Sequence, residues 1–160
     1  MIDDLYSARV LALVADMPRA GRLADPDGSA EKVAKLCGSR IIVDVALDDE
    51  GRVADFAQDV KACALGQATA AVLGAHVLGS DLAELTVTRD ALRAMLKADG
   101  PAPEGRFSEL SVLEPVKDYP ARHASTLLAF DAAVEAVQAA EHARRTRDAT
   151  KTRTSTAGAA

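Results

Sequence analysis

The segment IIVDVALDDEGRVADFAQDV, residues 41–60, constrains the fold more than any other part of the chain. In its first half every second residue is a large aliphatic one, namely Ile41, Val43, Val45 and Leu47. A period of two with β-branched side chains predicts a half-buried strand. Residues 48–51 are a turn signal, and residues 53–60 predict a second strand. The segment is therefore expected to form an antiparallel hairpin.

Helical patterns on both sides of this hairpin define the fold class. Apolar spacing over residues 5–17 predicts a helix that ends at Pro18, and the Gly-, Pro- and Asp-rich residues 18–31 predict a loop. Small residues at 64–78 predict a helix after the hairpin, and Thr88 is expected to cap the next one. The remaining helices are expected over residues 89–97, 107–113 and 122–143. The predicted class is α+β, a small antiparallel β-sheet with helices packed on one face.

The C-terminal residues differ in composition from the rest of the chain. The 160 residues are 49% hydrophobic but only 3% aromatic, so one aliphatic core is expected. Residues 144–160 contain no large apolar side chain and carry five basic residues against one acid. Such a segment buries too little surface to order itself. We expect a domain over residues 1–143 and a disordered, solvated tail over residues 144–160.

Charge and hydropathy exclude several classes of function. The net charge of −5 argues against sequence-independent nucleic-acid binding, which needs a basic surface. No apolar run approaches the length of about 18 residues that a membrane span requires. Acidic residues stand near the N-terminus where a signal peptide has lysines, so a cytoplasmic location is expected. A disulfide between the two cysteines is the less favoured arrangement in that compartment.

The two cysteines lie just outside the two strands of the expected hairpin. Cys37 precedes the first strand, and Cys63 follows the second. The start of one antiparallel strand lies beside the end of its partner, so both thiols are expected at one end of the sheet. Cys63 also stands at the start of the 64–78 helix, whose dipole favours a thiolate. The alternative is two unrelated cysteines, one of them packed as a small hydrophobe.

Several segments, in this order, resemble the U-type iron–sulfur cluster scaffold family, which comprises IscU, SufU and the N-terminal domain of NifU. DLYSARVLALVADMPRAGRL is similar to the family's first helix and its Asn-Pro-Arg loop. CGSRIIVDVALDDEGRVADFAQDVKACALGQATAA resembles its Cys-Gly-Asp motif, hairpin and second cysteine, while LRAMLK and YPARHASTLLAF resemble the SufU branch. The resemblance covers residues 3–140 and implies an α+β fold like that of IscU and NifU.

The resemblance also implies a function that is not enzymatic. Proteins of this family bind iron or a labile iron–sulfur cluster, take sulfur from a cysteine desulfurase and pass the cluster to apo recipient proteins. Cys37 and Cys63 match the family's first two cysteines, Ser39 falls on its aspartate, and Ser125 falls on its third cysteine. A serine hydroxyl is a poor ligand for soft metals, so two of the four implied ligands are weakened.

Two arrangements would complete a 2Fe–2S site, which usually takes four protein ligands. A homodimer would supply Cys37 and Cys63 from each of two protomers. A monomer would use both cysteines, His123 and a serine or an external thiol, because histidine is a good ligand for iron and zinc. The alternative for His123 is a surface histidine near a helix start. Iron is the expected metal, and zinc is the second candidate.

Two other functions compete with the scaffold. A degenerate scaffold would act as a sulfur acceptor, or as an interaction module for a cysteine desulfurase, and needs only one reactive cysteine. A cysteine hydrolase would need Cys63 as nucleophile and His123 as base, but no local signature supports it. We expect the scaffold function, since it accounts for the most residues.

Overall fold

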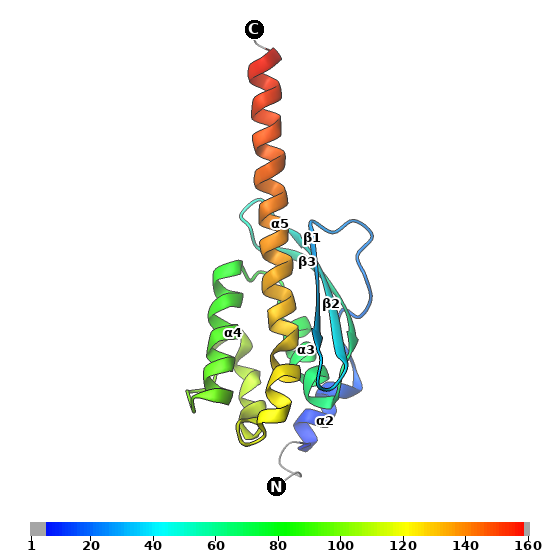
Figure 1. The fold of residues 1–160 in the computed structure, drawn as a ribbon, viewed down its shortest axis with the longest axis vertical. Helices are drawn as coiled ribbons and strands as arrows, with labels where there is room; N and C mark the ends of the chain where they lie inside the picture. The colour runs from blue at the N-terminus through cyan, green and yellow to red at the C-terminus, as the bar shows by residue number, and fades with distance from the viewer. Residues whose placement is uncertain (1–5, 159–160) are drawn as a thin grey trace.

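A three-stranded sheet and the helices that cover it make up the molecule (Figure 1). The computed structural model describes the backbone of residues 6–158 and the side chains of residues 6–150. The helices are α2 (Ala8–Ala15), α3 (Ala64–His76), α4 (Leu82–Lys97) and α5 (His123–Gly158), with the 3-10 segments η1 (Gly105–Asp118) and η2 (Pro120–Arg122) before α5. The strands are β1 (Gly28–Ala34), β2 (Ser39–Leu47) and β3 (Val53–Lys61).

The predicted hairpin is confirmed, but a further strand pairs with it. The order is β1-β2-β3 and both pairs are antiparallel, with Ala34 opposite Ser39 and Arg40 opposite Lys61. β1 begins inside the segment 18–31 that the sequence assigns to a loop. Its residues, GSAEKVA, include one β-branched side chain and two charges, so they lack the usual strand signal. The α+β class is confirmed, with three strands rather than two.

Both faces of β2 are buried, whereas its sequence pattern predicts one buried face. Val43 lies opposite Gln58, whose side chain donates to a carbonyl of α3 at 2.9 Å, so the odd positions face the helices. Asp44 points to the other side and accepts a hydrogen bond from the Arg22 side chain at 2.7 Å. The loop of residues 18–27 therefore covers the outer face of the strand. From sequence alone, a charged residue such as Asp44 suggests an exposed face. It is buried here because Arg22 of the covering loop pairs with it.

Helix starts differ from the prediction where another cap is used. α4 begins at Leu82 because the Asp81 side chain accepts a hydrogen bond from the Glu84 N–H at 2.8 Å. Thr88, the predicted cap, is instead buried inside this helix. α2 follows Ser7, whose hydroxyl accepts a bond from Val10 N–H, and it is shorter than the predicted helix 5–17. Several residue types, including Asp, Ser and Thr, can accept hydrogen bonds from the free N–H groups of a first turn. The first residue of a helix is therefore hard to choose from sequence when more than one of them is present.

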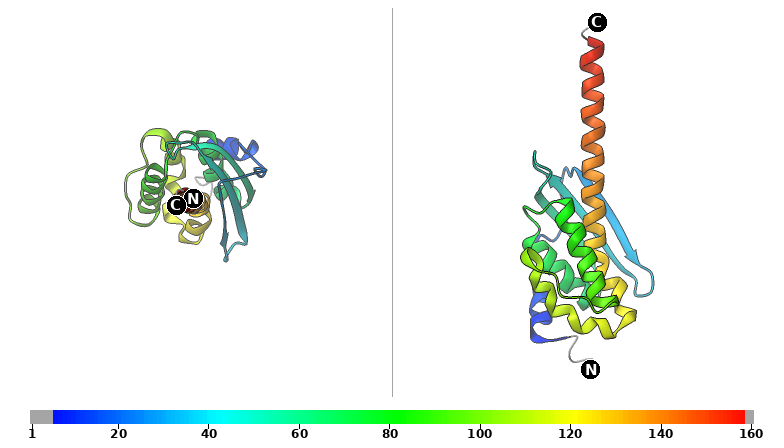
Figure 2. Two further views of the ribbon diagram at one scale, coloured as in Figure 1. Left: turned by 90° about the horizontal axis from the view of Figure 1, so that it is seen from above. Right: turned by 90° about the vertical axis from the view of Figure 1, so that its left-hand side faces the viewer.

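The last helix, α5, is much longer than the predicted helix 122–143 and continues to Gly158. It packs against β1 and β2 on the helical side of the sheet and projects well beyond the rest of the molecule (Figure 2). The Arg144 guanidinium donates to the carbonyls of Asp48 at 2.7 Å and Leu47 at 3.1 Å. The segment predicted to be a disordered tail, residues 144–160, is therefore helical up to residue 158. Its first residue, Arg144, is bound to the end of β2. No helix among the described residues is long and apolar enough to cross a membrane.

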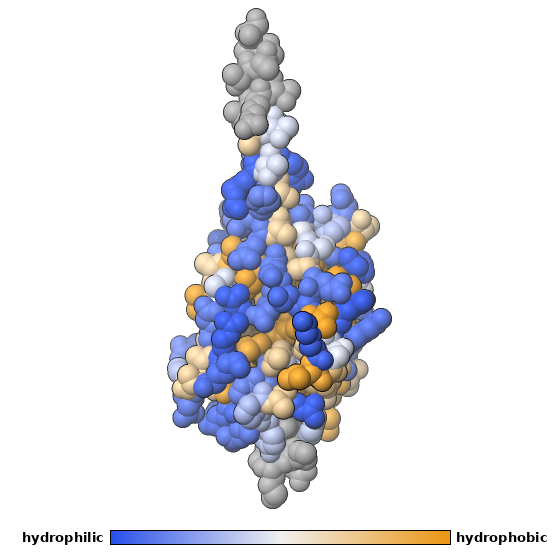
Figure 3. All heavy atoms as spheres, viewed as in Figure 1, coloured by the Kyte–Doolittle hydropathy of each residue, from blue (hydrophilic) through white to orange (hydrophobic). Residues whose placement is uncertain are grey.

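The helices α3 and α5 pack on one face of the sheet, as predicted, and α4 lies on the same side against α5 (Figure 2). Aliphatic and alanine side chains form most of the core between them. Phe107 and Phe130 add one edge-to-face pair with ring centroids 5.3 Å apart. The side of the molecule that Figure 3 shows is mostly hydrophilic, with hydrophobic patches between the hydrophilic residues.

Candidate functional site

Four side chains from three parts of the chain gather at one end of the sheet. Cys37 lies in the turn between β1 and β2, and Ser39 is the first residue of β2. Cys63 is the N-cap of α3, two residues after the end of β3, and Ser125 lies in the first turn of α5. The hairpin explains the two cysteines and Ser39, because its register brings both strand ends together. Ser125 reaches the same place through the packing of α5 against α3.

Each thiol has a serine hydroxyl as its neighbour. The Cys37 Sγ is 3.0 Å from the Ser39 Oγ, and the Cys63 thiol donates to the Ser125 Oγ at 3.4 Å. The Ser125 hydroxyl in turn donates to the carbonyl of Arg122 at 3.2 Å. Cys37 is exposed and Cys63 is partly buried, whereas both serines are buried. The thiols are therefore accessible from outside, and the hydroxyls support them from within.

A glycine in α3 allows this arrangement. A Cβ at Gly66 would lie 2.9 Å from the Ala62 Cβ and 3.1 Å from the backbone oxygen of Ser125. Any side chain there would separate the start of α3 from the start of α5, and with it Cys63 from Ser125. Sequence reasoning does not single out Gly66, although the run of small residues after Cys63 indicates close helix packing.

The surroundings of Cys37 favour its thiolate form. The hydrogen bond with Ser39 is the main reason that the pKa of Cys37 is lowered. Partial burial opposes this, and hydrogen bonds with backbone atoms and with Ser125 add to the lowering. A thiolate is the form that binds metals and attacks sulfur electrophiles. The Cys37 thiol is therefore exposed to solvent and also has a lowered pKa, which favours its reactive thiolate form.

We expect Ser39→Ala to raise the pKa of Cys37 and slow its alkylation at neutral pH. One lost hydrogen bond is worth about 1 kcal/mol, which corresponds to a change of about fivefold in the thiolate fraction. The rate of iodoacetamide labelling of the Cys37 peptide, followed by mass spectrometry across a pH series, measures the effect. Ser108→Ala, at an exposed position in η1, is the matched control. An unchanged pH midpoint in Ser39→Ala would show that Ser39 does not activate the thiol.

The structure does not bring His123 into this cluster as a third ligand. Its Nε2 lies 3.0 Å from the Val116 carbonyl and 3.2 Å from the Lys117 carbonyl. Carbonyl oxygens only accept, so the Nε2 carries the hydrogen, and only the Nδ1 of this ring keeps a lone pair. Within the part of the chain that is described, no three His, Cys, Asp or Glu side chains gather closely enough to hold a metal ion. The ring holds η1 against the start of α5.

The donor set fits a soft metal only in part. Two thiols suit iron, zinc or a cluster, whereas the two hydroxyls beside them are weak ligands for such metals. The site is open, since Cys37 and the adjacent Leu36 are exposed. It therefore suits a loosely held metal or cluster that stays accessible to other molecules.

Fold and site together define a class of protein, a small α+β domain with cysteines at one end of its sheet. The family model for the NifU-like N terminal domain matches residues 5–126. The chain belongs to this family, which confirms the resemblance stated from the sequence motifs. The chain is also 24% identical over 134 residues to the iron–sulfur cluster assembly scaffold protein IscU of Thermotoga maritima, covering 84% of this chain and 93% of that protein.

Solved structures show the same fold. The N-terminal part of a nitrogen-fixing NifU-like protein from Brucella abortus is 50% identical, with a TM-score of 0.85, covering 88% of this chain and 97% of that one. A putative scaffold protein for the SUF system from Fervidobacterium islandicum has a TM-score of 0.76 at 19% identity, covering 83% of this chain and 96% of that one. At that identity the second likeness shows the fold alone.

Proposed function

We propose that this protein is a scaffold for iron–sulfur cluster assembly, which binds iron or a labile cluster through Cys37 and Cys63. The observation that carries the proposal is the convergence of both thiols at one open end of the sheet. Family membership supports it, because a relative bears the name of an iron–sulfur cluster assembly scaffold. The expected cargo is a 2Fe–2S cluster, and the protein would bind and release it without being an enzyme.

The geometry suits transient binding. The Cys37 thiolate lies in an exposed turn, where a cysteine desulfurase can deliver sulfur and an apo recipient can take the cluster. Cys63 at the first turn of α3 places sulfur beside free backbone N–H groups, which stabilise negative charge there. We propose that both partners act in the cytoplasm. His123 is not part of this proposed ligand set, because among the described residues it does not gather with both thiols into a group of three potential ligands.

A second candidate function is that of a sulfur acceptor, and the exposed, activated Cys37 favours it. The Cys37 thiolate would attack the outer sulfur of a desulfurase persulfide. The sulfur–sulfur bond of that persulfide breaks, the desulfurase leaves as a thiolate, and Cys37 becomes the persulfide. This step needs only one reactive cysteine, Cys37. The two functions therefore differ in their requirement for Cys63, which the scaffold needs and the sulfur acceptor does not.

We expect anaerobic reconstitution with iron and sulfide to give a coloured protein, and Cys37→Ser or Cys63→Ser to abolish the colour. Each variant removes half of the thiolates that one chain contributes, and a hydroxyl does not replace them. Visible absorbance and bound iron measure the loss, and His123→Gln, which leaves both thiols in place, is expected to retain the iron. A colourless wild type that gains one sulfur atom on Cys37, seen by mass spectrometry, would favour the sulfur acceptor instead.

A further inference from the structure

A hollow of about 520 Å³ lies where α2, the end of α3 and η1 meet, and we call it the η1 hollow. It is lined by Arg9 of α2, His76 of α3, and Arg106, Ser108, Glu109 and Ser111 of η1. Because Cys63 stands at the start of α3 and His76 is its last residue, the length of this helix, about 20 Å, separates the hollow from the thiols. Small-molecule sites have volumes of about 300–1,000 Å³, so the η1 hollow has the size of a ligand site.

Three side chains of the η1 hollow are available to a ligand. Arg9, Ser108 and Ser111 are exposed, and in the described part of the chain their side chains have no hydrogen-bond or ion-pair partner. A guanidinium group offers five N–H donors, and each hydroxyl offers one donor. The three side chains therefore present donors from α2 and η1 to a ligand with several acceptor oxygens.

Arg106 adds a second guanidinium group, which is already held in position. Its Nε donates to the Glu84 carboxylate at 3.0 Å, and its Nη1 donates to the Leu78 carbonyl at 2.9 Å. These two bonds fix the group and leave further N–H donors of the same side chain for a ligand. Two guanidinium groups with their planar forks match the oxygens of a phosphate group better than a single cation does.

Carboxylates at the same place restrict the kind of anion that fits. Glu109 lines the η1 hollow with its Oε1 3.5 Å from the Nε2 of His76, and Glu84 lies beside Arg106. These negative charges weaken the attraction of a bare phosphate ion. A ligand that also carries hydroxyl groups gains from Glu109, because a hydroxyl donates a charge-assisted hydrogen bond to a carboxylate. The volume of the hollow also leaves room for an organic part beside the phosphate.

We propose that the η1 hollow binds a phosphate monoester with hydroxyl groups on its organic part, the class of sugar phosphates and nucleoside monophosphates. Its phosphate accepts hydrogen bonds from Arg9, Arg106 and the two serine hydroxyls, and one of its hydroxyls donates to Glu109. The ligand joins α2 to η1 across the hollow. No covalent bond changes, and the binding does not depend on the scaffold function.

Isothermal titration calorimetry of the full chain, without iron or sulfide and at constant ionic strength, tests this with ribose 5-phosphate, adenosine monophosphate and inorganic phosphate. The monoesters are expected to bind at least about tenfold more tightly than inorganic phosphate, because their hydroxyl groups bond to Glu109. Tighter binding of adenosine monophosphate would assign the hollow to nucleotides, and tighter binding of ribose 5-phosphate would assign it to sugar phosphates. Monoesters that bind no more tightly than inorganic phosphate, or no binding at millimolar concentrations, would overturn the proposal.

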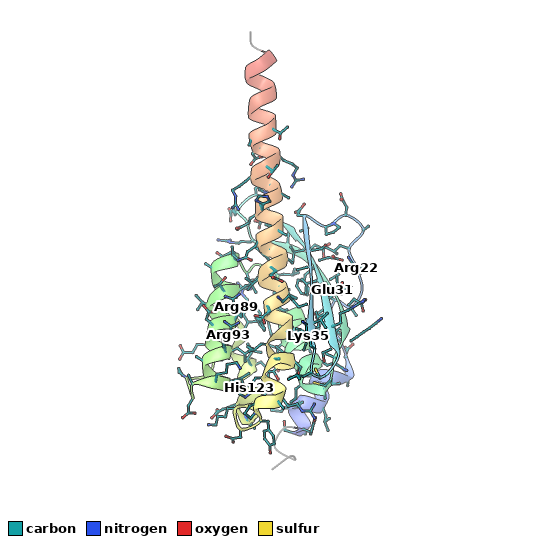
Figure 4. All side chains as sticks on the ribbon, viewed as in Figure 1. Arg22, Glu31, Lys35, Arg89, Arg93 and His123 are labelled. Atoms are coloured by element: carbon teal, nitrogen blue, oxygen red, sulfur yellow. The ribbon has the colours of Figure 1, made fainter. Side chains whose placement is uncertain are left out.

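Two arginine variants locate the binding. Arg9→Gln removes a charge-assisted contact to the phosphate, so its affinity for the monoester is expected to fall at least about tenfold. Arg93→Gln, the control, removes the same charge from α4, where Arg93 is labelled in Figure 4 and pairs with Asp131 of α5. This control should bind the monoester as the wild type does. An equal loss of affinity in both variants would show a general attraction of anions and overturn the assigned site.

Glu109→Ala tests the contact with the organic part of the ligand. This substitution removes the acceptor for the ligand's hydroxyl group and also removes a charge that opposes phosphate. The preference for ribose 5-phosphate over inorganic phosphate is therefore expected to fall to within about twofold, while both still bind. A preference that keeps its wild-type value would overturn the role of Glu109 and with it the class of ligand.

Discussion

Gly28→Val is expected to prevent this protein from folding, or to destabilise it by more than about 4 kcal/mol. A Cβ at Gly28 would overlap the backbone oxygen of Ala136 and the backbone nitrogen of Ala140, and it would lie 2.9 Å from the Ala140 Cα. These are main-chain atoms of α5, so no side chain can turn away to make room. β1 would have to leave either α5 or its partner Val45 on β2.

Urea unfolding followed by circular dichroism measures this loss. Glu31→Ala, at an exposed position of the same strand, is the matched control and should change the free energy of unfolding by no more than about 0.5 kcal/mol. A Gly28→Val protein with the midpoint of the wild type would show that β1 does not pack against α5 as closely as the structure has it.

Asp44→Asn is expected to lower the free energy of unfolding by about 2–3 kcal/mol. The Asp44 side chain is fully buried and accepts hydrogen bonds from Arg22, from the Ser29 hydroxyl and from the Leu23 N–H. An asparagine keeps the size but loses the charge, and its NH2 group would face donors. Because the Arg22 side chain is 52% exposed, water can solvate it after the change, which limits the loss.

The same substitution should remove part of the protein's acid sensitivity. Burial would raise the pKa of Asp44, but the hydrogen bonds from Arg22, Ser29 and Leu23 outweigh it and lower that pKa below the ordinary value. A carboxyl whose pKa is lower in the folded state stabilises the fold above its unfolded pKa of about 4, and this contribution is lost as the pH falls through the folded value. The stability difference between wild type and Asp44→Asn should therefore be full at pH 7 and shrink below about pH 4. Asp55→Asn, on an exposed part of β3, is the control, and a difference that stays constant into acid would contradict the assignment.

The hairpin is predictable from sequence because its own residues specify it, whereas β1 is not. β2 has β-branched residues in alternation, a signal that local reasoning can detect. β1 has Gly28, Ala30 and Ala34 on its inner face, and these small side chains reflect how closely α5 approaches. That reason is tertiary, since the α5 residues involved lie more than a hundred positions away. The start of the α5 extension beyond residue 143 has a similar explanation, because Arg144 binds carbonyls at the end of β2.

The candidate site divides in the same way. The meeting of Cys37 and Cys63 at one end of the sheet follows from the hairpin alone. Ser39 and Ser125 are identified by the family resemblance, and the structure places each beside a thiol. The orientation of His123 could not be predicted, because it depends on two carbonyls at the end of η1 that only the folded chain brings to its ring.

Cluster transfer tests the scaffold function most directly. The protein is loaded anaerobically, mixed with an apo ferredoxin that takes a 2Fe–2S cluster, and followed by circular dichroism in the visible range with an iron chelator present. The account predicts that the ferredoxin acquires its cluster despite the chelator, because the cluster passes directly from Cys37 and Cys63 to the recipient. A cluster that stays on this protein, or iron that appears only in the chelator, would contradict it.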